Sequence, residues 1–171
     1  LGIPVREPGT HRYYNSLLAL SDKPGFYHKR HLVPFGDYLP LEEFLRGLIR
    51  FFDLPMSGFS AGPDQQPLLQ AAGQKVASAI CYEDTFGEEL IAALPEATLL
   101  VNATNNAWYG NSFAPHQHLE MSRLRALETG RYMLRVTTNG VSAIIDQHGQ
   151  IRGRSPQFET HVLSGEAVPF T

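Results

Sequence analysis

The chain has 171 residues, of which 43% are hydrophobic and 18% are charged, and its net charge at pH 7 is −3. These values describe one globular domain with a substantial core, and the scattered Lys and Arg residues argue against a nucleic-acid partner. No run of about 18 apolar residues predicts a membrane span, and a single cysteine excludes an intramolecular disulfide.

Apolar periodicity and turn residues predict the elements of the first half of the chain. In chain order they are a strand at 15–20, a turn at 21–25, an extended segment at 26–33, a helix at 41–52 and a loop at 54–66. The helix is predicted from the spacing of apolar residues such as Phe44, Leu48 and Phe52, which recur at intervals of four residues.

The second half has the pattern of an α/β domain. The predicted elements are buried strands at 75–81 and 97–103, helices at 86–94 and 115–131, a hairpin of 132–138 and 141–146, and final strands at 150–154 and 162–168. Asn139-Gly140 is a strong hairpin signal, and Leu119, Leu124 and Leu127 are expected to form the buried stripe of the long helix. Strand–helix–strand–helix followed by a hairpin predicts a mixed sheet.

The only cysteine, Cys81, ends the predicted strand 75–81 and is followed by Tyr82, Glu83 and Asp84. At a strand-to-helix turn, a nucleophile projects from the sheet edge and the following backbone N–H groups face the reacting carbonyl. The helix N-terminus also favours the thiolate. A lone cysteine after an apolar run is more often a buried small hydrophobic residue, so this pattern leaves both interpretations open.

Two further segments are candidates for a site. Basic residues lead into a Pro/Gly turn in 27–40, where Lys29 is either a cation beside an oxyanion or part of a solvated strand end. Residues 102–110 hold polar and aromatic side chains after a buried strand, a place that often lines a site in α/β folds. An Asn-rich turn with local packing of Trp108 is the alternative. The seven histidines show no spacing of a metal site.

Taken together, these segments resemble one family, the apolipoprotein N-acyltransferases of the nitrilase, or carbon–nitrogen hydrolase, superfamily. The stretches that carry the resemblance are KRHLVPFG at 29–36, ICYE at 80–83, NNAWYG at 105–110, PHQH at 115–118, RLRALE at 123–128 and TNGVS at 138–142. They follow the family's order over nearly the whole chain. The resemblance implies one α/β domain over residues 1–171, an αββα sandwich with mixed sheets that is incomplete at its N-terminus.

The resemblance also implies a Glu–Lys–Cys catalytic set without cofactor or metal. Cys81 matches the nucleophile and Lys29 the catalytic lysine, while Glu83 and Tyr82 match positions that the family uses beside the nucleophile. Asp37 stands where the family usually has glutamate, and its side chain is one methylene shorter. The candidates for substrate binding are Phe35, Asn106 and Trp108.

The reaction implied is a two-step acyl transfer. Cys81 attacks a phospholipid ester, and the thioester then passes its acyl chain to the amine of a diacylglyceryl-cysteine lipoprotein. The apolar residues of 41–59 are expected to form a lid over acyl chains or an amphipathic helix packed on the core. Two alternatives are a soluble nitrilase-like amidase acting on a small amide and a catalytically silent binding module of the same fold.

The family's general-base glutamate belongs to a motif that this sequence does not contain, because the neighbours of Glu7 do not match it. With Leu1 in place of Met, we expect the chain to be the interior of a longer protein. That protein is expected in a bacterial inner membrane, held by upstream helices, with this domain facing the periplasm. The 171 residues alone are expected to be inactive.

Overall fold

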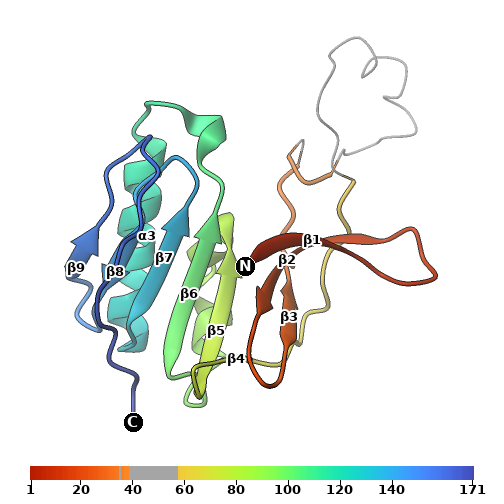
Figure 1. Cartoon of the computed structure of the whole chain (residues 1–171), viewed down its shortest axis with the longest axis horizontal. Helices are drawn as coiled ribbons and strands as arrows, with labels where there is room; N and C mark the ends of the chain where they lie inside the picture. Colours follow the sequence, from red (N-terminus) through yellow and green to blue (C-terminus); the bar gives the residue numbers. More distant parts are fainter. Residues whose placement is uncertain (35, 39–57) are drawn as a thin grey trace.

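The computed structural model describes residues 1–34, 36–38 and 58–171. Phe35, the helix predicted at 41–52, the lid predicted at 41–59 (except 58–59) and the start of the loop predicted at 54–66 lie outside these residues. Figure 1 shows a three-stranded sheet beside a six-stranded sheet. The smaller sheet is antiparallel and consists of β1 (Gly2–Arg6), β2 (Tyr13–Ala19) and β3 (Gly25–His28).

The smaller sheet confirms the strand predicted at 15–20, the turn that follows it and the start of the extended segment. Strand β1 was not predicted. Its five residues alternate between exposed and half-buried, and Pro4 in their middle marks an edge strand with a weak apolar pattern.

The larger sheet is mixed, as predicted. Its strands lie in chain order: β4 (Leu69–Ala71), β5 (Gln74–Ile80), β6 (Leu99–Thr104), β7 (Met133–Thr137), β8 (Ala143–Ile145) and β9 (Ile151–Arg154). Strands β5, β6 and β7 are parallel, and the remaining pairs are antiparallel. The two parallel crossovers run through α2 (Gly87–Ile91) and α3 (Ala114–Thr129).

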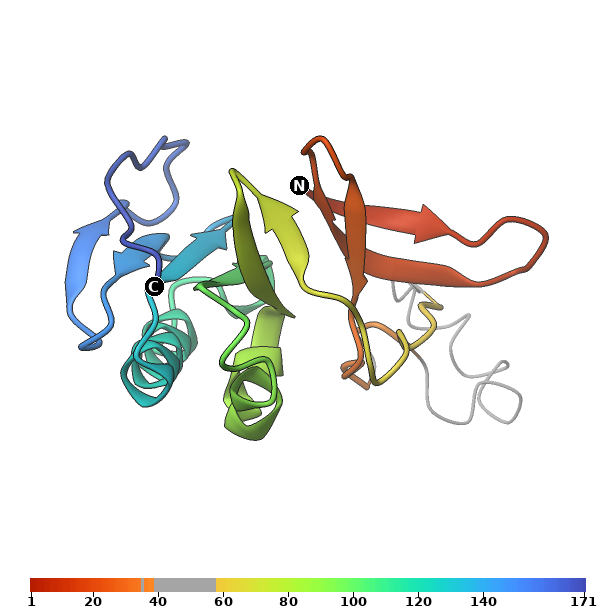
Figure 2. The same ribbon diagram turned by 90° about the horizontal axis from the view of Figure 1, so that it is seen from below.

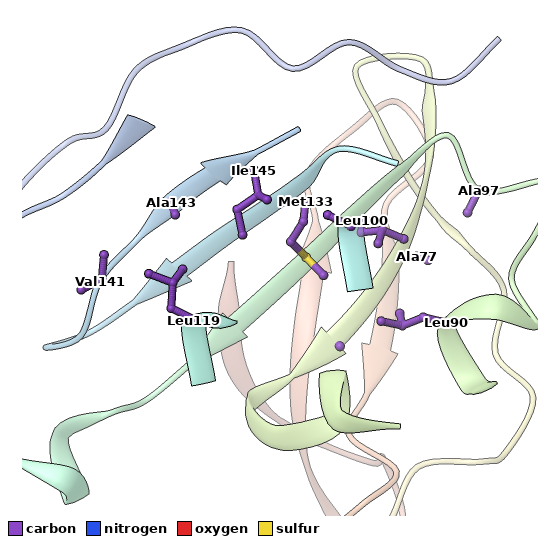
Figure 3. Packing of buried hydrophobic residues seen from close by; sticks show 11 residues of the cluster. Ala77, Leu90, Ala97, Leu100, Leu119, Met133, Val141, Ala143 and Ile145 are labelled. Carbon is purple, nitrogen blue, oxygen red and sulfur yellow. The ribbon is translucent and has the colours of Figure 1, made fainter. Parts of the chain in front are cut away.

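Both helices cover the same face of the larger sheet (Figure 2). The described residues therefore build one helical layer and two sheets of the expected αββα arrangement. Strand β5 is buried on both faces, because Ala77 and Ala79 pack toward the helices while Val76 and Ile80 pack toward the smaller sheet. Figure 3 shows the helix-side core, in which Leu100 and Met133 from the sheet cluster with Leu119 from α3.

Two predictions about the second half are wrong. No strand forms at 162–168, where Val162 and Val168 are 85% and 61% exposed. This segment instead runs over the sheet, and its end is held by the Phe170 N–H, which donates to the Thr98 carbonyl at 3.1 Å. Its apolar residues therefore do not mark a paired strand.

The predicted apolar stripe of α3 is also wrong at two of its three positions. Leu119 is buried, but Leu124 and Leu127 are half exposed, at 50% and 53%. The buried face instead carries polar side chains among small apolar ones, and its residues are Pro115, His118, Leu119, Ser122, Ala126 and Thr129. The helix turns a polar face inward because that face meets polar groups from the sheet.

Candidate active site

Cys81 lies at the turn where β5 ends. It is the first residue of a 3-10 turn, Cys81–Thr85, that leads to α2. Its φ of 57° is in the left-handed region, which is unfavourable for a residue with a Cβ. The side chain is half-buried. The structure thus places Cys81 at the strand-to-helix turn predicted from the sequence, in a strained backbone conformation that neighbouring groups must hold.

Glu83 is buried and ties the lysine loop to the cysteine turn. Its carboxylate accepts hydrogen bonds from the N–H groups of Ile80 (2.7 Å), Arg30 (2.6 Å) and His31 (3.1 Å) and from the Tyr27 hydroxyl (3.0 Å). Burial raises the pKa of Glu83, and the three backbone N–H groups oppose that rise. With four donors around it, this carboxylate positions the two loops.

Lys29 and Asp37 form a buried ion pair. The Lys29 Nζ lies 2.5 Å from the Asp37 Oδ2, and Lys29 is only 2% exposed. The same Asp37 oxygen accepts from the Val33 N–H at 2.8 Å. The shorter side chain at position 37 therefore still reaches the lysine.

Tyr82 packs beside this ion pair. The Lys29 Nζ lies 5.5 Å from the centre of the Tyr82 ring, and the Tyr82 hydroxyl donates to the Leu32 carbonyl at 3.2 Å. Burial raises the pKa of Tyr82, and the negative charges of Asp37 and Glu83 raise it further. A phenol that stays protonated can hold the lysine loop over a wide pH range.

Cys81, Lys29 and Asp37 line one cavity of about 810 Å³. This volume is in the range of sites that take a small molecule or one segment of a lipid. Its wall includes Ile80, Ala103 and Val136, which are register partners in β5, β6 and β7.

Two aromatic side chains on η2 (Ala107–Tyr109) also line the cavity. Trp108 is 68% exposed and Tyr109 is 46% exposed. Burial raises the pKa of Tyr109, and negative charge on Cys81, which lines the same cavity, raises it further. Trp108 thus lies at the cavity, and its contact with substrate remains a prediction.

Asn106 lies apart from the cavity. It is 1% exposed, does not appear among the described residues that line the cavity, and its Oδ1 accepts from the Thr104 hydroxyl at 3.3 Å. Its amide packs against Gly140, where a Cβ would lie only 2.4 Å from the Asn106 Nδ2. Its position supports the hairpin turn, and a contact with substrate remains a prediction.

A second group of polar side chains lies behind Cys81, on the helix side of the sheet. The Cys81 carbonyl accepts from the Asn102 Nδ2 at 2.8 Å and from the His118 Nε2 at 3.1 Å. The His118 Nε2 also lies 2.9 Å from the Asp84 Oδ1. These contacts anchor the carbonyl of the strained residue.

Arg135 and Ser122 complete this group. The Arg135 Nη1 donates to the Asn102 Oδ1 and to the Ser122 Oγ, each at 2.8 Å, and the Ser122 hydroxyl donates to the Asp84 Oδ2 at 2.6 Å. Burial lowers the pKa of Arg135, and the negative charges of Asp84 and Cys81 oppose that change. Sequence reasoning did not single out Ser122 or Arg135, although an arginine inside the apolar run 133–136 was an available signal.

Within the part of the chain that the structure describes, no group of three His, Cys, Asp or Glu side chains is arranged to hold a metal ion. In the same residues, no helix combines the length and the apolar character needed to cross a membrane.

Comparison with known proteins finds one matching family model and several relatives that share one name. The family model for carbon-nitrogen hydrolase matches residues 1–168. The chain is 52% identical over 169 residues to the apolipoprotein N-acyltransferase of Methylococcus capsulatus, and 50% and 47% identical over 171 residues to those of Pseudomonas syringae pv. tomato and Pseudomonas aeruginosa. The matches cover 98–99% of this chain but only 34% of each relative, so the chain spans about a third of their length.

Two solved structures are similar in fold. A carbon-nitrogen hydrolase from Helicobacter pylori G27 has a TM-score of 0.65 and 14% identity, over 90% of this chain and 56% of that chain. The NitFhit protein of C. elegans has a TM-score of 0.67 and 19% identity, over 91% of this chain and 38% of that chain.

Proposed function

Because the chain belongs to the carbon–nitrogen hydrolase family, we propose that it is the part of an acyltransferase that forms a thioester at Cys81. The acyl donor is a phospholipid, and the acceptor is the N-terminal amine of a diacylglyceryl-cysteine lipoprotein. The full-length protein acts at a bacterial inner membrane with this domain on the periplasmic side.

One observation carries the proposal. Cys81, at a strained strand-to-helix turn, lines the same cavity as the buried Lys29. A half-buried thiol and a buried cation that line one cavity suit nucleophilic catalysis, because the cation can offset the charge that develops on the substrate oxygen. Identities of 47–52% to relatives named apolipoprotein N-acyltransferase favour this substrate class over a small amide or a silent binding module.

In the first step, the Cys81 sulfur adds to the ester carbonyl of the phospholipid. The Lys29 ammonium and the backbone N–H of Tyr82 hold the oxyanion. When the oxyanion collapses, the C–O bond breaks, the lysophospholipid oxygen takes the proton that the general base removed from the Cys81 thiol and leaves, and the acyl group remains on sulfur.

In the second step, the acceptor amine adds to the thioester carbonyl. The new C–N bond forms, the C–S bond breaks, and the amine proton passes to a general base while Cys81 returns as thiolate. Asp37 is the only carboxylate among the described residues that line the cavity, and it is already paired with Lys29. We assign the base to a glutamate in the part of the relatives' length that this chain does not span.

The test uses the full-length protein and a phospholipid with a labelled acyl chain. Mass spectrometry should detect an enzyme adduct with the mass of one acyl group, and the Cys81→Ala protein should show none. Thr129→Val, a buried change on α3 away from the cavity, should still form the adduct. An acyl adduct that survives Cys81→Ala ends the proposal.

A further inference from the structure

Five buried polar residues lie behind the nucleophile: Asp84, Asn102, His118, Ser122 and Arg135. We call them the elbow network. Each is at most 7% exposed, and none lines the cavity. Burying polar groups costs stability unless they are hydrogen-bonded, and each of these residues has a hydrogen bond within the network, which is centred on the backbone carbonyl of Cys81. The Arg135 Nε and Nη2 have no hydrogen-bond partner among the described residues.

Register explains why the network forms on this side. Asn102 in β6 and Arg135 in β7 are register partners, and their neighbours in each strand, Leu100 and Met133, face the helices. Side chains two apart in a strand lie on the same face. Asn102 and Arg135 therefore point toward the polar face of α3, where His118 completes the contact.

The donor directions in the network are determined by chemistry. Arg135 can only donate, so the amide oxygen of Asn102 must face it and the amide nitrogen must face the Cys81 carbonyl. The His118 Nε2 lies between two acceptors, that carbonyl and the Asp84 carboxylate, so Nε2 carries the proton. Two N–H donors thus hold one carbonyl from fixed directions.

Holding this carbonyl also orients the next N–H group. In a planar trans peptide the C=O and the following N–H point in opposite directions. Since the Cys81 carbonyl points toward Asn102 and His118, the Tyr82 N–H points to the other side of the turn. On that side of the sheet, Ile80 and Ala103 line the cavity.

We propose that the elbow network orients the Tyr82 N–H as an oxyanion donor by anchoring the Cys81 carbonyl. The proposal rests on the proposed function in one respect, that Cys81 is acylated by addition to a carbonyl. It separates two reactions of the same thiol. Addition to an ester creates an oxyanion and needs the N–H donor, whereas displacement at iodoacetamide creates none and does not.

The experiment measures both reactions in the full-length protein, with p-nitrophenyl butyrate for acylation and iodoacetamide for alkylation. Asn102→Leu and His118→Leu should lower the acylation rate on the order of tenfold to a hundredfold, with alkylation within about threefold of the original rate. His118→Gln should recover most of the acylation rate, because its side-chain amide N–H can replace the imidazole Nε2–H. Asp146→Asn alters a buried carboxylate in the β8–β9 turn and should change neither rate.

Equal losses in acylation and alkylation, or no loss in either, would overturn the proposal, as would a His118→Gln protein no faster than His118→Leu. If a leucine variant does not fold, Ser122→Ala carries the test, since it removes one hydroxyl of the network and should slow acylation alone by severalfold. A wild-type protein that is acylated by the nitrophenyl ester but never by a phospholipid would end the proposed substrate assignment and leave this test intact.

Discussion

Two adjacent rows of the larger sheet run across the same three strands and have opposite character. Ile80, Ala103 and Val136 form one row, which is apolar and lines the open cavity. The next row is Ala79, Asn102 and Arg135, and its last two members are polar, almost completely buried, and turned toward the helices. The usual distribution, polar outside and apolar inside, is reversed at this edge of the sheet.

Under the proposed function, this reversal assigns substrate binding to one face of the sheet and positioning of the nucleophile to the other. An apolar wall suits the acyl chain of a lipid, where a buried polar group would lose its hydrogen bonds to water. The polar side chains on the helix side instead fix the backbone of the strained Cys81, whose φ is 57°. A buried network can hold a strained residue because its members have few other conformations available.

The largest expected effect concerns the base that the cavity face needs. Residues 1–171 expressed alone, given phospholipid and a diacylglyceryl-peptide acceptor, should show no turnover above that of Cys81→Ala. Displacing a catalytic base by about 1 Å can already lower the rate a hundredfold, and these residues are expected to hold no base at all in the required position. The same assay with the full-length protein is the control. Repeated turnover by residues 1–171 would mean that these residues supply the base.

Substitution of Lys29, on the cavity face, should have the next largest effect on the rate. Lys29→Ala should lower kcat/KM for the full-length protein on the order of a hundredfold or more, because an oxyanion contact is lost. Lys29→Arg should not restore the rate, because the planar guanidinium does not replace a point charge against Asp37. Near-normal turnover in Lys29→Ala would assign the lysine a structural role only.

Asp84 tests the helix face, where the main effect should be on stability. Asp84→Asn leaves the buried Arg135 guanidinium without a charge partner and should lower the free energy of unfolding by about 3 kcal/mol. Urea denaturation of the full-length protein in detergent measures this loss. Asp146→Asn is the matched control at a second buried carboxylate, whose partner Arg152 is half exposed, and should cost about 1 kcal/mol.

Trp108 should give the smallest effect, confined to binding. Its ring is 68% exposed at the cavity, so Trp108→Ala should change the free energy of unfolding by less than about 0.5 kcal/mol. The KM for phospholipid should rise roughly threefold to tenfold while kcat stays unchanged, since an aromatic contact to the substrate is lost. Leu124→Ala, on the outer side of α3, is the control for an exposed apolar side chain, and a similar KM change there would remove Trp108 from the site.

Local patterns in the sequence were sufficient for the α/β class, for the buried strands β5 and β6, for the hairpin at Asn139-Gly140 and for Cys81 at its turn. Each depends on residues close together in the chain, such as an apolar run followed at once by acids, or a dipeptide that favours one turn. The resemblance carried by 29–36, 80–83 and 105–110 was sufficient to indicate the family.

Tertiary structure alone decided which side chains meet behind the nucleophile. Arg135 and Asn102 are 33 positions apart and touch only because β6 and β7 pair in one register. For the same reason α3 buries His118 and Ser122 and leaves Leu124 exposed, since a helix turns inward the face that satisfies the groups it meets. Periodicity reports how apolar residues are spaced, but not that a buried charge on a neighbouring strand requires a polar partner.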